Sequence, residues 1–223
     1  MAEFPASPLP PKQFLETWLP RAFAEAELPP EARDAEVQLG LALVGDGGGE
    51  WLFDVKGGSL TVTPGSRADA AFTVVQSVAD WRGALWEGRG GAIGRQSLAM
   101  FRPGAQAAAP ARPGQMGAGA PSPAALAEMR KLNGMIRMEV TGAEGGDWAV
   151  AFKLGPGPIP EQPTTTVSIA SADADAMDRG ELDPMQAFMS GKLRVAGDMG
   201  LMMQMQAIQM QVAAAQAAQK GTA

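Results

Sequence analysis

Residues 180–203, GELDPMQAFMSGKLRVAGDMGLMM, carry the pattern that decides how the C-terminal half of this chain folds. Asp183 can act as the N-cap of a short helix, because its carboxylate can accept hydrogen bonds from the first helical turn. Pro184 fits that same turn, where its missing N–H does no harm. The i, i+3, i+4 spacing then places three apolar side chains on one helix face: Met185, Phe188 and Met189.

The second part of this stretch predicts a short strand between two glycine-containing turns. Gly191 ends the helix, and residues 192–195 alternate polar and apolar side chains as a strand does. Gly197 and Asp198 then turn the chain into a last helix that begins at Met199. Almost no reactive side chain lies in this helix–strand–helix unit, so its content favours binding an apolar molecule over making or breaking bonds.

The same residues resemble the C-terminal signature of the sterol carrier protein type 2 family. In that family a "GeldP..aF.sGklkv.Gd" run precedes a final helix that closes a lipid tunnel, and this chain follows the run nearly residue for residue from Gly180 to Asp198. The resemblance implies an α+β fold with a mainly antiparallel five-stranded sheet per copy, helices covering one face, and an apolar cavity. It also implies a non-catalytic carrier of fatty acids, fatty acyl-CoA, sterols or phospholipids.

The apolar pattern and the resemblance together give the candidate ligand-binding residues. Most lie in the C-terminal stretch, and the others lie on a helix expected after Ser77, where the family's helix lines its cavity. The candidates are Met185, Phe188, Met189, Leu193, Met199, Met202, Met203, Trp81, Leu85 and Trp86. The alternative for the tryptophans is that they are ordinary core residues.

The last predicted helix carries two apolar stripes on nearly opposite sides. Leu201, Met205, Ile208 and Val212 form one stripe, and Met199, Met203 and Met210 form the other. Two stripes predict that the sheet covers one side of this helix and that a ligand, a lid or a partner chain covers the other. Methionine suits a promiscuous lipid site because its flexible side chain adapts to differently shaped apolar partners. The alternatives are core filler and a seam between two copies of the chain.

Composition excludes most other functions. The chain has 223 residues, 46% of them apolar, and a net charge of −6, so a large core is expected and nucleic-acid binding is not. It contains no cysteine, histidine or tyrosine, which removes thiol and imidazole chemistry and the usual soft metal ligands. We therefore expect no catalytic residues, no metal and no cofactor. The N-terminus shows no secretory signal and no segment suits a membrane span, so a cytoplasmic location is expected, with a homodimer possible.

The order of elements predicts an internal duplication. Residues 1–102 form the first expected repeat, 103–123 an Ala/Gly/Pro linker, and 124–223 the second repeat with the Met-rich helix. The first repeat lacks a clear ending of the kind seen at 187–198, and the second has GPGPIPEQP at 155–163 where the family has a full strand. Each half is incomplete where the other is better formed, so the halves are expected to pair into one unit. The alternative is one elaborated domain.

Hydrophobic periodicity and turn residues predict the remaining elements. The first half is expected to have a helix over 11–26 with a kink or break at Pro20, strands over 36–44, 50–55, 59–63 and 70–75, and a helix from Ser77 to Gly88. Residues 88–94 are expected to form a turn. The second half is expected to have a helix over 124–132 and strands over 135–140, 147–154 and 165–170.

Overall fold

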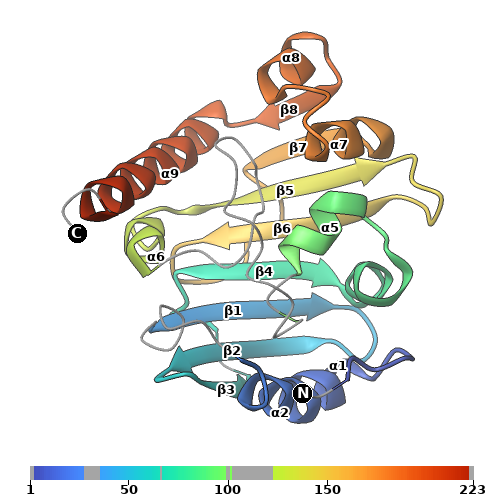
Figure 1. Ribbon diagram of the computed structural model, residues 1–223, viewed down its shortest axis with the longest axis vertical. Coiled ribbons are helices and arrows are strands. Elements are labelled where there is room, and N and C mark those ends of the chain that lie inside the picture. The colour runs from blue at the N-terminus through green and yellow to red at the C-terminus, as the bar shows by residue number, and fades with distance from the viewer. Residues whose placement is uncertain (1–2, 28–35, 66, 99–100, 102–122, 221–223) are drawn as a thin grey trace.

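The computed structural model describes residues 3–27, 36–65, 67–98, 101 and 123–220. Eight strands lie in these ranges, close to the predicted bounds: β1 (Val37–Val44), β2 (Gly49–Lys56), β3 (Ser59–Pro64), β4 (Phe72–Ser77), β5 (Gly134–Thr141), β6 (Trp148–Leu154), β7 (Thr165–Ala170) and β8 (Leu193–Gly197). They form a single sheet in the order β3-β2-β1-β4-β6-β5-β7-β8 (Figure 1). The predicted linker, 103–123, lies outside the described residues except for Pro123.

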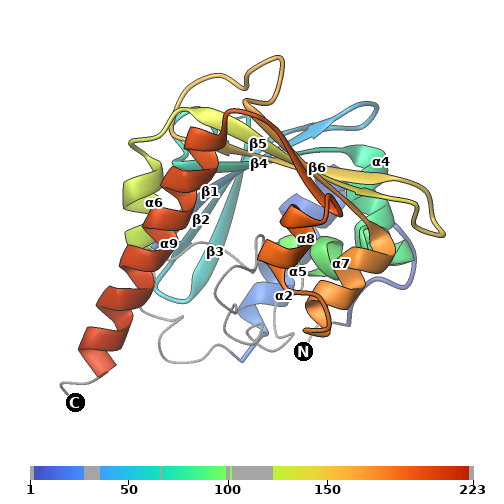
Figure 2. The same ribbon diagram turned by 90° about the horizontal axis from the view of Figure 1, so that it is seen from above.

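The helices lie on one face of this sheet, as the resemblance implies (Figure 2). Those of the first half are α1 (Pro11–Gln13), η1 (Phe14–Trp18, a π-helical turn), α2 (Leu19–Ala24), α4 (Val78–Arg82), η2 (Gly83–Glu87, also π-helical) and α5 (Gly91–Ser97). Those of the second half are α6 (Pro123–Met129), α7 (Ser171–Asp178), α8 (Pro184–Met189) and α9 (Met199–Lys220). The fold is therefore α+β, with the core between the helices and one face of the sheet.

Both halves use the same order of strand pairing. In the first half β2 runs antiparallel to β1 and β4 runs parallel to it. In the second half β6 runs antiparallel to β5 and β7 runs parallel to it. The first half then adds β3 beside β2, and the second adds β8 beside β7. This recurrence is compatible with a duplication, which stays a prediction.

The expectation of five strands per copy is wrong, because one sheet of eight strands contains four from each half. The halves meet where β4 pairs antiparallel with β6, from Phe72 opposite Leu154 to Val75 opposite Ala151. No strand follows β4 in the described part of the first half, and 155–163 forms no strand beside β6. Each of these two strands would otherwise present unpaired backbone groups, and their pairing satisfies both edges.

The glycine- and proline-rich segment 155–163 also joins the halves. The backbone N–H of Gly155 donates to the carbonyl of Ala71 at 2.8 Å, and that of Gly157 donates to the carbonyl of Ala68 at 2.6 Å. Gly155 has φ +74, and a Cβ there would lie 1.9 Å from the carbonyl oxygen of Leu132. The backbone of this segment therefore sits directly against the loop that precedes β4, in a position that only glycine fits.

A buried lysine supports this segment. Lys153, in β6, is 1% exposed, and its ammonium group donates to the carbonyl oxygens of Gly155 and Pro156. Arg67 lies close by, also buried, and donates from Nη1 to the carbonyl of Gly157 at 3.3 Å. Burial, and then the positive charge of Arg67, lower the pKa of Lys153 below its usual 10.5. Two basic residues thus hold the segment that takes the place of a strand.

Two local expectations need correction. The first helix passes Pro20 without a break, because the π-helical turn η1, in which the Leu19 N–H donates to the Phe14 carbonyl, shifts the hydrogen-bond register just before it. The expected turn over 88–94 is wrong in its second part, since α5 begins at Gly91. The glycines that obscure this helix allow close packing: a Cβ at Gly94 would lie 2.4 Å from the Arg89 carbonyl oxygen.

Candidate functional site

The short helix α8 forms as the sequence predicts. Asp183 Oδ1 accepts hydrogen bonds from the N–H of Met185 at 2.8 Å and from that of Gln186 at 3.1 Å. Pro184 occupies the first turn, and Gly191, with φ +73, lies in the left-handed turn that follows the helix. The motif therefore fixes where α8 begins and where the chain leaves it for β8.

The apolar face of α8 points outward. Ala187 is fully buried and anchors the helix on the core. Met185, Phe188 and Met189 are 66%, 42% and 81% exposed. Large apolar side chains with this exposure, adjacent along one helix, form a patch of the kind that meets a ligand, a membrane or another protein.

The two stripes of α9 have different environments. Leu201 and Ile208 are buried, and Met205 and Val212 pack partly buried against the core, so the first stripe faces the protein. Met199, Met203 and Met210 are exposed, so the second stripe faces away from it. The two apolar stripes therefore lie on different sides of α9, as the spacing predicts. The cover expected over the second stripe is not supplied by a described element of this chain.

Five exposed side chains lie near the two ends of β8, in the helices α8 before it and α9 after it. We call them the apolar band: Met185, Phe188, Met189, Met199 and Met203. The helix α8 precedes β8 and α9 follows it, and α8 and the start of α9 lie at the border of the sheet that β8 forms (Figure 1). Two further candidates from the same elements, Leu193 in β8 and Met202 in α9, are buried. The structure thus gathers all the C-terminal candidate residues at one border.

Two basic side chains beside the apolar band are paired with acidic ones, and exposed Arg194 donates from Nε to the carbonyl of Gly191. Lys192 Nζ lies 2.6 Å from Asp173 Oδ1, and Arg179 Nη2 lies 2.8 Å from Glu181 Oε2. This border therefore has no concentrated positive charge, and attraction to anionic surfaces is not what distinguishes it.

The other candidates, Trp81, Leu85 and Trp86, lie apart from the apolar band, in α4 and η2 over the first half. Trp81 and Leu85 are almost fully buried. The ring centroid of Trp81 lies 5.3 Å from that of Phe14 and 5.5 Å from that of Trp86. Trp86 Nε1 donates to the carbonyl of Pro5 at 2.8 Å. Aromatic side chains therefore fill the space beside these candidates.

Several members of this aromatic cluster were not among the candidate residues. Phe4 contacts the rings of Phe14, Trp18 and Trp86, and Phe101 contacts those of Trp81 and Phe53. The sequence signal for this cluster was the presence of aromatic residues at 4, 14 and 18. These positions lie in the first half, outside the motif at 180–203 from which most candidates came.

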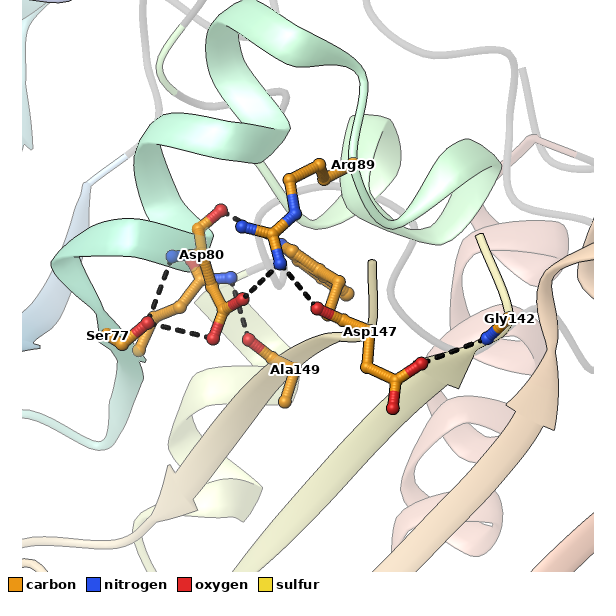
Figure 3. A network of polar contacts seen from close by, with 8 residues as sticks. Ser77, Asp80, Arg89, Gly142, Asp147 and Ala149 are labelled. Atoms are coloured by element: carbon orange, nitrogen blue, oxygen red, sulfur yellow. Dashed lines mark hydrogen bonds and ion pairs between the residues drawn. The ribbon is translucent and has the colours of Figure 1, made fainter. Parts of the chain in front are cut away.

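A polar network that the sequence did not predict lies where the halves meet (Figure 3). Arg89 Nη2 donates to the carbonyl of Asp147 at 2.6 Å and lies 3.7 Å from Asp80 Oδ1. Trp148 Nε1 donates to the carbonyl of Asp80 at 3.0 Å, and Ser77 caps α4 by accepting from the Asp80 N–H. These contacts tie the start of α4 in the first half to the β5–β6 turn in the second.

A depression of about 230 Å³ beside this network is polar rather than apolar. Asp80, Arg137, Glu139, Thr141, Asp147, Trp148 and Ala149 line it. Each acidic group in it already has a partner: Asp80 has Arg89, Glu139 accepts from Arg137 at 2.7 Å, and Asp147 accepts from the Gly142 N–H at 3.0 Å. The network therefore holds the two halves together and offers no free acidic group among the described residues of this depression.

The described residues offer little for catalysis or metal binding. The chain lacks histidine and cysteine, and within the described ranges no three acidic side chains are placed to hold a metal ion. Nor does any helix of the described part combine the length and apolar character needed to cross a membrane. What the structure presents is an α+β module with an exposed apolar band beside a sheet edge.

Comparison with known proteins agrees with the motif. Residues 115–210 match the model of the SCP-2 sterol transfer family. The matched segment includes β5 to β8 and the first twelve residues of α9. The resemblance drawn from residues 180–203 is therefore confirmed for the C-terminal half.

Similar proteins match this chain over part of its length, and the two curated relatives below are covered over a small share of their own length. Sterol carrier protein 2 of Rattus norvegicus is 33% identical over 90 residues, which cover 37% of this chain and 16% of that protein. Hydroxysteroid dehydrogenase-like protein 2 of Xenopus tropicalis is 34% identical over 85 residues, covering 36% and 20%. The sterol carrier protein domain 2 of Helicoverpa armigera, a solved structure, is 29% identical with a TM-score of 0.31, covering 39% of this chain and 74% of that one.

Proposed function

We propose that this chain binds lipids without converting them and that the second half holds the ligand. The observation that carries the proposal is that the segment matching the SCP-2 sterol transfer family contains the apolar band and the buried residues beneath it. A relative that is 33% identical over 90 residues is named sterol carrier protein 2. The ligands that fit are fatty acids, fatty acyl-CoA, sterols and phospholipids.

Burial of apolar ligand surface would supply the affinity. Each Å² of apolar surface removed from water contributes roughly 25 cal/mol, so an acyl chain covered by methionine and phenylalanine side chains needs few polar anchors. Methionine dominates the band, and its flexible thioether packs against differently shaped partners at little cost. Low selectivity among lipids of similar length follows.

The second half is the better location for the ligand because the candidate residues of the first half, in α4 and η2, pack against aromatic side chains. Phe14 stacks on Trp18 with ring centroids 4.7 Å apart and meets Trp81 edge to face. A ligand entering there would have to displace several ring contacts. Around β8, by contrast, the large apolar side chains are exposed and available. The proposed ligand residues are Met185, Phe188, Met189, Leu193, Met199, Met202 and Met203.

Binding of a fluorescent fatty acid to charged variants tests this proposal. Phe188→Asp and Met203→Asp should each abolish binding, because a carboxylate covered by an acyl chain loses several kcal/mol of hydration unless it finds a partner. Val44→Asp is the matched control, since Val44 is 61% exposed but lies at the end of β1 in the first half. Unchanged affinity in folded Phe188→Asp and Met203→Asp would move the site elsewhere, first to Trp81, Leu85 and Trp86.

A second candidate is a lipid-presenting accessory role beside an enzyme. It is favoured by the relative named hydroxysteroid dehydrogenase-like protein 2, of which the match covers only 20%. On either proposal this chain has no catalytic activity of its own, which assays of acyl-CoA ester turnover test directly. A native mass spectrum of gently purified protein separates a carrier, which retains lipid, from a module that binds none.

A further inference from the structure

The strand β8 lies at one border of the described sheet. Among the described strands it pairs with β7 alone, and every residue from Arg194 to Gly197 is exposed or half-buried. The opposite edge of the sheet, β3, is contacted by η1 and α2 and ends in Pro64, which cannot donate a backbone hydrogen bond. Covering helices and proline are the usual means by which proteins prevent unwanted strand pairing. The strand β8 contains no proline, and although α8 contacts it, no described strand pairs with its outer edge.

The pattern of hydrogen bonds shows which residues of β8 face that edge. At the end of the β7–β8 ladder the N–H of Asp198 donates to the carbonyl of Thr164 at 3.0 Å. Residues along an antiparallel strand alternate between the two neighbours, so Arg194 and Ala196 also direct their backbone groups to β7. Leu193, Val195 and Gly197 therefore direct theirs away from the sheet.

We propose that β8 pairs antiparallel with β8 of a second copy of this chain, about a two-fold axis at Val195. In this register the two Val195 residues exchange hydrogen bonds, and Arg194 lies opposite Ala196 of the second copy. A two-fold axis at Arg194 would instead place two guanidinium groups side by side, which is unfavourable. Charge repulsion therefore disfavours the register centred on Arg194.

The same register brings opposite charges and apolar surfaces together. Lys192, which pairs with Asp173 within its own chain, comes opposite Asp198 of the second copy, and Asp198 comes opposite Lys192 of the second copy. Because α8 precedes β8 and α9 follows it, antiparallel pairing also places α8 of one copy beside the start of α9 of the second. Met185, Phe188 and Met189 then face Met199 and Met203 of the second copy, on the helical side of a continuous sheet. A second copy therefore supplies the cover that α9 lacks in the single chain.

Proline substitution tests the strand pairing. Val195→Pro removes an N–H that points away from β7, so it should preserve the fold and convert a dimer into a monomer in light scattering after size-exclusion chromatography. Val195→Thr, which keeps the N–H and a β-branched side chain, is the matched control and should remain dimeric. A monomeric native protein across a range of concentrations, or a Val195→Pro variant that stays dimeric, would overturn the proposal.

A cysteine variant tests the register even if proline disturbs the fold. The chain has no cysteine, so a single introduced thiol can form a disulfide only between two copies. Cα atoms of a hydrogen-bonded pair lie about 5.5 Å apart, within the range a disulfide spans, so Val195→Cys should cross-link on mild oxidation. Thr61→Cys, at an exposed position of β3, should not. Equal cross-linking of both variants would show random collision and contradict the specific pairing.

This inference can fail separately from the proposed function. The mass measurement uses protein stripped of lipid, so it reports pairing alone. Fatty-acid binding by the Val195→Pro monomer reports the ligand site in the absence of the second copy, because Val195 is not among the residues proposed to hold lipid.

Discussion

The ring of Phe72 in β4 stacks on the ring of Phe152 in β6, with ring centroids 5.5 Å apart and ring planes at 22°. These strands belong to different halves of the chain and pair directly with each other. The stack therefore lies on the seam where two incomplete groups of strands become one sheet, and it makes each half part of the other's core.

A double-mutant cycle should detect coupling across this seam. Phe72→Leu and Phe152→Leu each shrink one ring, and the coupling between them in the free energy of unfolding should be about 0.5–1.5 kcal/mol, as for other aromatic pairs. Denaturant unfolding of the two single variants and the double variant measures it. Phe72→Leu combined with Phe188→Leu, on α8 at the far border of the sheet, should be additive. Additivity in both cycles would show that the stack contributes nothing specific.

Separation of the halves should abolish cooperative folding. A cut between residues 113 and 114 leaves every described strand and helix intact, yet it separates β4 from β6. Each fragment would then expose an unpaired edge and the apolar faces around it. We expect neither fragment to unfold in a sharp transition when heated alone, and an equimolar mixture to regain one transition. Two fragments that each melt sharply by themselves would show independent domains.

The sequence predicted elements much better than it predicted their assembly. Asp183, Pro184 and Gly191 act through local geometry, so the helix α8 and its ends could be read directly. The number of strands in the sheet depended instead on which strand pairs with β4. That strand is β6, which lies on the other side of the linker. No local pattern reports such a pairing; only the degenerate segment 155–163 hinted at it.

In the candidate site, too, local features could be predicted and long-range contacts could not. Spacing along the helices correctly placed the outward methionines, because a helix has a fixed period. The surroundings of Trp81 depended on Phe14 and Phe101, which come from other parts of the chain and whose rings meet it at centroid distances of 5.3 and 6.3 Å. A tryptophan in a core and a tryptophan beside a ligand look alike in sequence.

Gly90 should tolerate no side chain, because it meets two constraints at once. Its φ is +78, and a Cβ there would lie 2.5 Å from the ring of Trp148, which is buried. Gly142 has a similar φ of +69 but nothing within 4 Å, so Gly142→Ala isolates the conformational cost. That cost is about 1 kcal/mol. Gly90→Ala should destabilise the protein by about 2 kcal/mol more than Gly142→Ala in denaturant unfolding, since the indole must shift. Equal losses would mean that the Trp148 ring moves freely.

The buried Lys153 should give the protein a distinctive dependence of stability on pH. Its pKa is lowered in the folded protein, by burial first and by Arg67 second, relative to 10.5 in the unfolded chain. Between these two values the unfolded chain holds the proton and the folded protein does not, so the free energy of unfolding rises with pH. Below the lowered value both states are protonated and the penalty of burying the charge is fully present.

Comparison with Lys153→Met isolates this contribution. The variant lacks the titrating group, so the stability of the native protein minus that of the variant should increase as pH rises toward 10.5. The neutral amine still has two N–H donors, enough for the carbonyls of Gly155 and Pro156. In the variant those carbonyls lose their donor, which costs about 1–3 kcal/mol at any pH and shifts the difference without changing its slope. Lys131→Met, at an exposed position, controls for the loss of one positive charge. A difference that stays flat or falls with pH would mean that Lys153 keeps its proton throughout, with the buried ammonium fully stabilised by the segment it supports.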